Sequence, residues 1–274
     1  MEIKRRDLAG ALSLSCVENY FLAWLKDYDL KKLYGAAFVG VKEVLEGFIH
    51  GALYQNYRGI PRLQDVAEEY GLTEHDYRVC GAGEAMKIIR EQKEHELCLI
   101  RVNPQFFVGF KRSSWREDHY VCVDRALNWV NQYPLSEGVF DEETFAKVYD
   151  GAVNVYRTLD PEAELPKIIE QEFVEQDFHG IELPQGLPEM EGAIGVLRVT
   201  RKRMEECFTG NSGIKEILQE ENHMLDKIYL DTYRLRLKQR SGTGAGYSEE
   251  KQRLRERLKE IIELERRAAG GDGK

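Results

Sequence analysis

The residues of this chain best suited to chemistry are a cysteine, a histidine and an asparagine, in that order. Cys16 begins an apolar helical pattern directly after Ser15, which is a suitable N-cap. A thiol in the first turn of a helix has its pKa lowered by the helix dipole and by the amides of that turn. The same amides can stabilise a developing oxyanion. Cys16 is therefore a candidate nucleophile.

The candidate base for this thiol is His119, and the candidate that orients its ring is Asn131. His119 begins the pattern HYVCVD and Asn131 ends the pattern LNWVN, and both patterns are typical of strands. A turn around Arg125 and Ala126 would join them as an antiparallel hairpin, so both side chains are expected near the same end of it. Nucleophile, base and orienting amide then follow the logic of a catalytic triad.

Each member of this set also has a structural interpretation. A single cysteine at the start of an apolar helix is more often a small buried residue than a nucleophile. A histidine at the start of a strand is more often a surface or core residue than a base. The conjunction of the two with Asn131 makes the catalytic interpretation comparable in strength to the structural one, and the residues alone leave both open.

The elements that must position these residues change in type along the first half of the chain. Helices come first, at residues 13–25, 41–54 and 61–70, the last with proline in its first turn and glycine after its end. Short segments rich in β-branched and aromatic residues follow. Strands are expected at 95–102, 105–111, 119–124, 127–131 and 152–158, with a helix at 142–149. Helices followed by an antiparallel sheet indicate an α+β domain over residues 1–158.

The second half of the chain is expected to be helical. Residues 159–188 are acidic and carry prolines, which is typical of a linker. A helical region follows over residues 189–267. Its helices are expected at 193–208, 213–239 and 248–267, and a disordered tail at 268–274.

Charge and composition exclude several classes of protein. The formal net charge of −9 disfavours nonspecific binding to nucleic acid. No apolar run approaches the roughly 18 residues of a membrane span, and the N-terminus lacks the apolar stretch of a secretory signal. A cytoplasmic protein without a membrane partner is therefore expected. The five cysteines include no CxxC pair and the histidines show no metal-ligand spacing, so neither a disulfide framework nor a metal site is expected.

The segments SCVENYFLAWL, IPRLQDVAEEYG, WREDHYVCV and VNQYPL together resemble the N-terminal family of butirosin-biosynthesis protein H, over about residues 10–158. That family is papain-like and akin to the peptidases that trim bacteriocin leaders. In such relatives a cysteine precedes the central helix, and an HY strand is followed by a polar residue just before a proline. The matching positions here are Cys16, His119 with Tyr120, and Asn131 or Gln132 ahead of Pro134. The resemblance implies a papain-like fold and leaves open which of the two amides orients the histidine.

One position departs from the bacteriocin-leader peptidases, which carry a glutamine six residues before the cysteine to complete the oxyanion hole. Gly10 stands there in this chain, and no glutamine occurs in the first fifty residues. The amides of Cys16 and Val17, with the hydroxyl of Ser13 or Ser15, would have to serve instead. A weaker oxyanion hole suits a thioester better than a peptide, because the acyl carbon of a thioester is already activated. The named member of the family is itself an acyltransferase.

The resemblance and the missing glutamine therefore predict a cysteine-dependent acyltransferase of specialised-metabolite or antibiotic biosynthesis. It would move an acyl or aminoacyl group from an acyl or peptidyl carrier-protein thioester to a small amine. No cofactor of its own is expected, since the phosphopantetheine arm is presented by the carrier protein. A cysteine peptidase or amide hydrolase with the same residues is the alternative enzyme. A non-catalytic papain-like module that binds a peptide or a carrier protein is the alternative of a different class.

Residues beside the histidine are candidates for binding the carrier or the substrate. Lys111, Arg112 and Arg116 can bind a phosphate or the acidic helix of a carrier protein, and Trp115 and Tyr120 accompany them. A solvated surface loop is the alternative interpretation of this segment. The C-terminal helices can form a lid or carrier-docking platform, or a homodimer interface, and their lack of a strict heptad leaves both open.

Overall fold

The computed structural model describes residues 3–8, 12–50, 60–106, 118–165, 173–208, 212–240 and 247–270. The chain divides into two compact units, and each is described by itself. The sheet unit comprises residues 1–30 and 62–164, and the helical unit comprises residues 31–61 and 165–274. The sequence predicts one boundary, near residue 158. The structure has a boundary at 164/165 and, in addition, assigns the early segment 31–61 to the unit of the C-terminal helices.

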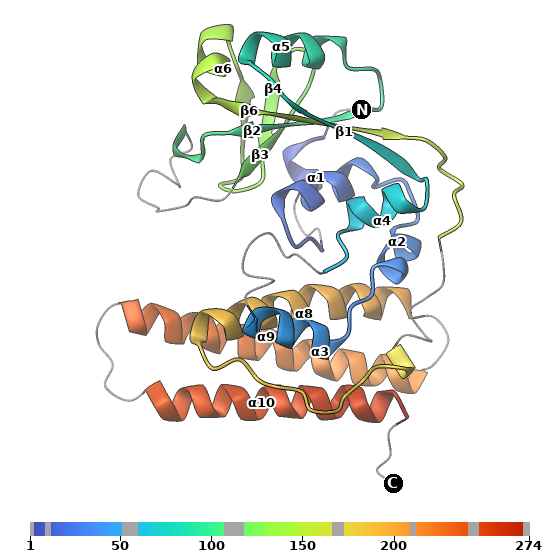
Figure 1. The fold of residues 1–274 in the computed structure, drawn as a ribbon, viewed down its shortest axis with the longest axis vertical. Coiled ribbons are helices and arrows are strands. Elements are labelled where there is room, and N and C mark those ends of the chain that lie inside the picture. Colours follow the sequence, from blue (N-terminus) through green and yellow to red (C-terminus); the bar gives the residue numbers. More distant parts are fainter. Residues whose placement is uncertain are drawn as a thin grey trace. The chain divides into compact units, whose positions relative to one another are not determined.

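Within the described residues, the sheet unit contains a six-stranded antiparallel sheet with the strand order β1-β6-β2-β3-β4-β5 (Figure 1). The strands are β1 (Thr73–Val79), β2 (Leu97–Val102), β3 (His119–Val123), β4 (Asn128–Asn131), β5 (Ser136–Val139) and β6 (Tyr149–Thr158). The helices are α1 (Cys16–Trp24), α4 (Leu63–Glu69), α5 (Ala82–Glu91) and α6 (Glu142–Val148). This mixture of helices with an antiparallel sheet is α+β, as the sequence predicts.

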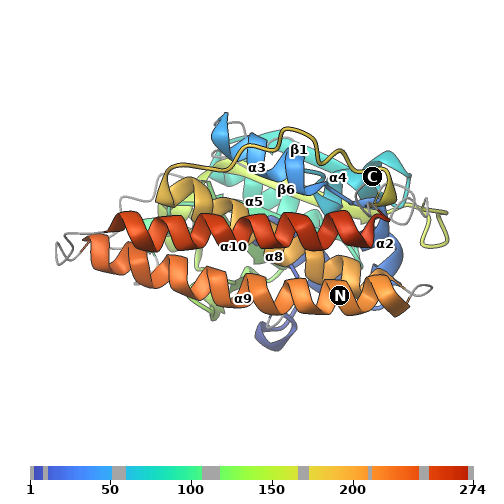
Figure 2. The same ribbon diagram turned by 90° about the horizontal axis from the view of Figure 1, so that it is seen from below.

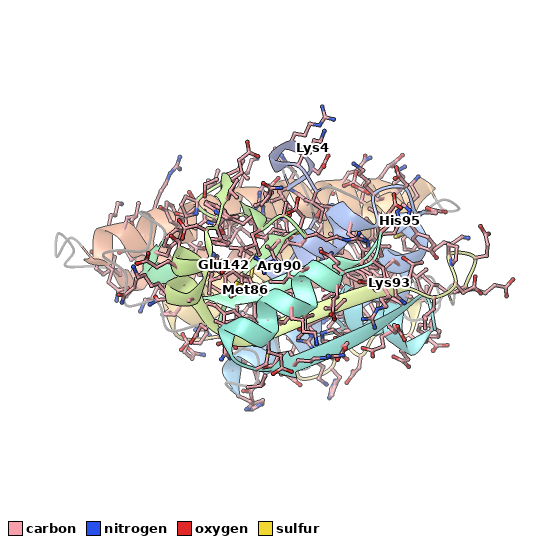
Figure 3. All side chains as sticks on the ribbon, turned by 90° about the horizontal axis from the view of Figure 1, so that it is seen from above. Lys4, Met86, Arg90, Lys93, His95 and Glu142 are labelled. Atoms are coloured by element: carbon pink, nitrogen blue, oxygen red, sulfur yellow. The ribbon has the colours of Figure 1, made fainter. Side chains whose placement is uncertain are left out.

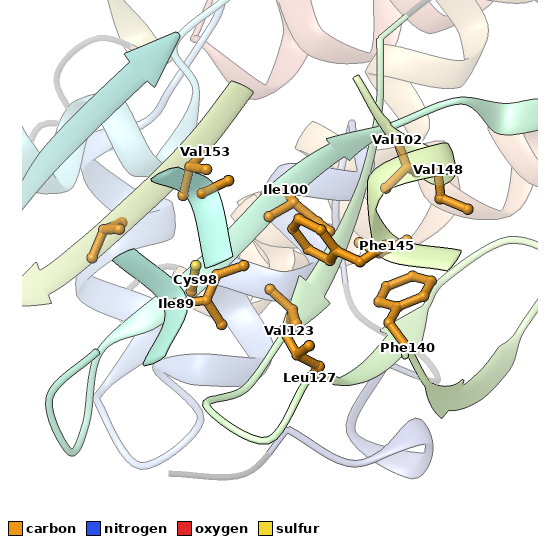
Figure 4. Packing of buried hydrophobic residues seen from close by; sticks show 13 residues of the cluster. Ile89, Cys98, Ile100, Val102, Val123, Leu127, Phe140, Phe145, Val148 and Val153 are labelled. Carbon is orange, nitrogen blue, oxygen red and sulfur yellow. The ribbon is translucent and has the colours of Figure 1, made fainter. Parts of the chain in front are cut away.

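One face of the sheet is covered by α5 and α6. Ile89 of α5 and Phe145 of α6 are fully buried and belong to one apolar cluster with Val123 of the sheet (Figure 4). At the outer surface of these helices Arg90 pairs with Glu142 at 2.6 Å (Figure 3). Burial of apolar area, at roughly 25 cal/mol per Å², holds this layer, since an exposed ion pair adds at most about 1 kcal/mol.

The helix that begins at Cys16 lies against the opposite face. Phe21 of α1 packs edge-on against Tyr156 of β6, with the ring centroids 5.5 Å apart. The indole of Trp24 donates a hydrogen bond to the carbonyl oxygen of His95 at 2.9 Å. Every residue of α1 from the third position onward is buried.

Several expected elements differ from those observed. The strand expected at 105–111 is wrong at its start, because Pro104–Phe106 form a short 3₁₀ helix, while residues 107–117 lie outside the described residues. The helix expected from Pro61 begins at Leu63, and of the expected 41–54 helix only Val41–Ile49 is seen, with 51–59 outside the described residues. Strands β1 and β5 and helix α5 were not expected. Both strands are edge strands with polar sequences, which lack a clear apolar alternation.

The described part of the helical unit is largely helical, and three of its helices, α8, α9 and α10, are long and lie side by side (Figure 2). The helices are α2 (Leu30–Ala36), α3 (Val41–Ile49), α8 (Leu187–Cys207), α9 (Ser212–Arg240) and α10 (Tyr247–Ala268). α3 packs on α8 at Gly192, where the Cβ of any other residue would overlap the ring of Phe48. The last two helices are where the sequence predicts them. α8 begins inside the expected linker, with Pro188 in its first turn.

A buried ionic cluster links the three long helices. The guanidinium of Arg201 pairs with Glu265 at 2.6 Å and lies 3.6 Å from Glu221, and all three side chains are fully buried. The same guanidinium donates to the carbonyl oxygen of Val39 at 2.7 Å. Burial, and then the neighbouring Glu265 carboxylate, raise the pKa of Glu221 well above its ordinary value. A protonated Glu221 leaves one positive and one negative charge in the cluster.

No helix in the part of the chain that the structure describes combines the length and the apolar character needed to cross a membrane.

Candidate active site

Cys16 is the first residue of α1, as the sequence predicts. Ser15 is the N-cap, with extended backbone dihedrals, and its hydroxyl accepts a hydrogen bond from the amide of Glu18 at 3.1 Å. The amides of the first two helical residues, Cys16 and Val17, point out of the N-terminal end of the helix because of its geometry. The Cys16 thiol is half-buried.

Glu18 has a structural role in this region that was not predicted from the sequence. Its carboxylate is buried and accepts hydrogen bonds from the amide of Leu14 and, at 3.1 Å, from the amide of Leu63 at the start of α4. It therefore ties the segment ahead of Cys16 to a second helix. The spacing Ser15-x-x-Glu18 is a capping-box pattern, and this signal was readable in the sequence.

His119 and Asn131 form a buried hydrogen-bonded pair at the end of the β3–β4 hairpin. The ring Nε2 of His119 lies 2.9 Å from Oδ1 of Asn131, and Nδ2 of Asn131 donates to the carbonyl oxygen of Pro134 at 3.0 Å. The second bond fixes which way the amide faces. Because Oδ1 can only accept, Nε2 of a neutral His119 carries the proton, and Nδ1 is the nitrogen whose lone pair can take one.

Burial is the main influence on the titration of this histidine. Removal of the ring from water lowers the pKa of His119 below its ordinary value, and the hydrogen bond to Asn131 only partly offsets this. A neutral imidazole near pH 7 is the form that can act as a base.

The hairpin that carries this pair is held by its turn and by an aromatic side chain. The carboxylate of Asp124 accepts hydrogen bonds from the amides of Ala126 and Asn128, each at 2.9 Å. Trp129 shares its side of β4 with Asn131, and its ring lies so close over Gly138 that a Cβ there would come within 2.8 Å. The expected turn around Arg125 and Ala126 is thus present, and Trp129 fixes β4 against β5.

Tyr20 connects α1 to β3 and to the residue that follows β4. Its buried hydroxyl donates to the carbonyl oxygen of Tyr120 at 3.3 Å and accepts from the amide of Gln132 at 2.9 Å. Tyr20 lies on the apolar face of the helix expected at 13–25, and nothing in the sequence indicates where its hydroxyl bonds. Gln132, one of the two amides expected to orient the histidine, uses its backbone here, while Asn131 contacts the ring.

Successive side chains at the start of β3 point to opposite faces of the sheet. The side chains of His119 and Val121 alternate onto the face covered by α5 and α6, whereas Tyr120, half-buried, is on the face covered by α1. His119 is the first residue of β3, so its ring lies at the end of that face.

The other thiols differ from Cys16 in their surroundings. Burial raises the pKa of Cys122 to about 12, and it raises the pKa of the fully buried Cys98 further. Cys80 is half-buried, with its sulfur 3.3 Å from the hydroxyl of Tyr149. Cys207 donates to the carbonyl oxygen of Lys31 at 3.0 Å.

The remaining expected site residues are not all described. Lys111, Arg112, Trp115 and Arg116 lie outside the described residues, as does Gly10. Among the residues that are described, no three His, Cys, Asp or Glu side chains gather in a way that could hold a metal ion.

Comparisons with models of protein families, with curated proteins and with solved structures found no match to this chain.

Proposed function

We propose that this chain is a cysteine-dependent acyltransferase with a papain-like sheet unit. The observation that carries the proposal is the buried His119–Asn131 pair, in which a fixed amide leaves Nδ1 of a neutral imidazole as the proton acceptor. Support comes from the position of Cys16 at the N-terminus of α1, which packs against the strand that begins with His119. A thiol, a base and an orienting amide are the groups that covalent acyl transfer needs.

In the first half-reaction, Nδ1 of His119 takes the proton of the Cys16 thiol. The sulfur attacks the carbonyl carbon of a carrier-bound thioester, so a bond from that carbon to Cys16 forms and its bond to the pantetheine sulfur breaks. His119 returns its proton to the departing pantetheine thiolate. The amides of Cys16 and Val17 are the donors to the oxyanion in this step.

In the second half-reaction, an amine attacks the acyl group on Cys16. His119 removes a proton from the amine, the carbon–nitrogen bond forms, and the bond to the Cys16 sulfur breaks. The proton then returns from His119 to the thiolate, which regenerates the resting enzyme.

This mechanism makes a definite demand on geometry. α1 lies on one face of the sheet, and His119 alternates onto the other, so the two reacting groups can meet only at the end of β3. Sγ of Cys16 and Nδ1 of His119 are expected within hydrogen-bond reach, or up to about 5 Å apart in a resting site. A crystal structure in which these two atoms are farther apart, and in which the end of β3 keeps the two side chains from approaching each other, would contradict the mechanism.

The deciding experiment measures the intact mass of the protein after incubation with an acyl-pantetheine thioester. We expect the mass of one acyl group, located on Cys16 by peptide mapping, and its loss when an amine is added. Cys16→Ser should prevent the labelling, and His119→Ala should slow it strongly. Cys80→Ser is the matched control, because that thiol is also half-buried, and it should leave labelling unchanged.

The same experiment separates the alternatives. A thioester has a good leaving group, whereas an amide needs stronger oxyanion stabilisation, and the loss of one oxyanion donor costs on the order of 10² to 10³ in rate. Because no glutamine precedes Cys16, we expect rapid acylation and poor peptide cleavage. Efficient peptide turnover without an acyl-Cys16 species would identify a peptidase. A Cys16 thiol that no thioester or alkylating agent labels would identify a binding module.

Recognition of a carrier protein is the second part of the proposal. Lys111, Arg112 and Arg116 are close in sequence to His119 and can attract the acidic surface of a carrier. Reversing these charges should slow acylation from a carrier-bound donor more than acylation from a small thioester. The gap should shrink at high salt, because salt screens attraction between surface charges. Equal effects on both donors would argue against a carrier partner.

A further inference from the structure

The hydroxyl of Tyr20 occupies a distinctive place in the sheet unit. Tyr20 is fully buried on α1, one helical turn after Cys16, so the two side chains share a face of the helix. The partners of its hydroxyl are the carbonyl of Tyr120 and the amide of Gln132. These two residues directly follow His119 and Asn131 in the chain.

One oxygen atom therefore joins three segments, each of which carries one member of the candidate triad. A buried phenylalanine would fill the same space but would leave a backbone N–H and a backbone carbonyl without this partner, and a buried polar group left unsatisfied is destabilising. Packing alone gives no reason for the hydroxyl. The bonds it makes hold α1 at a fixed distance from the backbone beside His119 and beside Asn131.

We propose that Tyr20 is the positioning residue of this site, holding Cys16 in register with the His119–Asn131 pair. The inference rests on the proposed function, since it assigns Tyr20 a role toward the same three residues. Tyr20 has a single hydroxyl proton, which it donates to the carbonyl of Tyr120, so it is not a donor to the oxyanion. It acts through the backbone of the hairpin and through α1.

The electrostatics of the site agree with this role. Burial, and then the negative charge of the Cys16 thiolate, raise the pKa of Tyr20 well above its ordinary value. The hydroxyl therefore stays protonated over the pH range in which a thiol–imidazole pair works. It remains a donor to Tyr120 and an acceptor from Gln132 whether or not Cys16 is ionised.

The experiment compares wild type, Tyr20→Phe and His119→Ala by the pH dependence of Cys16 alkylation with iodoacetamide, followed by peptide mass spectrometry. In the wild type, alkylation should persist well below the ordinary thiol pKa of about 8.5. In Tyr20→Phe the inflection should move up toward that value, so the rate at pH 6.5 should fall about tenfold or more. Tyr156→Phe is the matched control, because Tyr156 is also buried against α1 but contacts it through Phe21, and its profile should match wild type.

Protection of the Gln132 amide from hydrogen exchange provides an independent measurement. Exchange of the Gln132 amide should be slow in the wild type and faster in Tyr20→Phe. The amides of β2, in the middle of the sheet, should keep their protection in both.

The outcomes separate this inference from the proposed function. If wild type and His119→Ala both titrate near 8.5, Cys16 is not activated and the proposed function fails. If wild type is activated and Tyr20→Phe has the same profile, the positioning role alone is overturned. A Tyr20→Phe protein that does not fold, or an unprotected Gln132 amide in the wild type, also overturns the positioning role, because the hydroxyl would then serve stability or make no such bond.

Discussion

Replacing Asn131 by Asp changes the orienting amide into a carboxylate of nearly the same size. In the wild type, burial lowers the pKa of His119, and the neutral amide at 2.9 Å offsets this only in part. A carboxylate at that distance favours the imidazolium by about 1 to 3 pKa units, or about 1.4 to 4 kcal/mol. The pKa of His119 should therefore move from below about 6.5 to above it.

The effect on stability follows from which state binds the His119 proton more tightly. In the wild type the folded protein binds it more weakly than the unfolded chain, so this contribution is present above about 6.5 and is lost as the pH falls through the lowered pKa of His119. In Asn131→Asp the folded protein binds it more tightly, so this contribution is present below about 6.5 and is lost as the pH rises through the raised pKa. The His119 contribution to the free energy of unfolding thus changes the sign of its slope between about pH 5 and 8.

The assay is an NMR titration of the histidine ring protons, with His119→Gln used to assign the signal. A second His–Asn pair provides the matched control. His75 lies 2.8 Å from Asn154 in the same unit, so Asn154→Asp makes a similar change away from the candidate triad. It should leave the His119 titration unchanged. A wild-type His119 that titrates above 6.5, or an Asn131→Asp variant with an unmoved His119, would refute the reasoning.

Two further predictions concern the helical unit. Gly192→Ala should lower the free energy of unfolding by about 1–3 kcal/mol, because the added Cβ overlaps Phe48 and α3 must move away from α8. Chemical denaturation measures this loss, and an unchanged denaturation midpoint would contradict the close contact. Arg201→Met should lower the free energy of unfolding by about 3–5 kcal/mol, because it removes the cation that pairs with the buried Glu265 side chain. Glu221→Gln should cost far less, because burial raises the pKa of Glu221 and so favours its neutral form. Equal losses for the two variants would show that Glu221 is ionised.

Local sequence patterns predicted two parts of the candidate site, the helix N-terminus at Cys16 and the hairpin that carries His119 and Asn131. Ser15 as N-cap and Cys16 in the first turn follow from hydroxyl capping and from apolar periodicity, both of which act over a few residues. The β3–β4 hairpin follows from two short strand patterns and the turn that Asp124 organises. Asn131 meets His119 because a hairpin brings the ends of its strands together.

Contacts between distant segments could not be predicted in this way. The hydroxyl of Tyr20 bonds residues about a hundred positions away, and the carboxylate of Glu18 bonds an amide on α4. Such bonds depend on how the elements pack, which a single sequence does not encode in a local pattern. The edge strand β1 was not predicted for a related reason. Its C-terminal residues are exposed, and hydrogen bonding to β6 rather than apolar alternation stabilises it.

The packing of α3 on α8 has a consequence for the order in which the protein is synthesised and folded. α3 leaves the ribosome early, yet its partner follows only after almost the whole sheet unit has been made. Until then Phe48 and its apolar neighbours on α3 have nothing from α8 to cover them, and they belong to a loop that interrupts the nascent sheet unit. Exposed apolar segments of this kind are where chaperones bind and where aggregation begins. The apolar side chains of α3 are therefore buried only once α8 has been translated. A chain that stops short of α8 should be degraded or aggregate, even though it contains all three residues of the candidate triad.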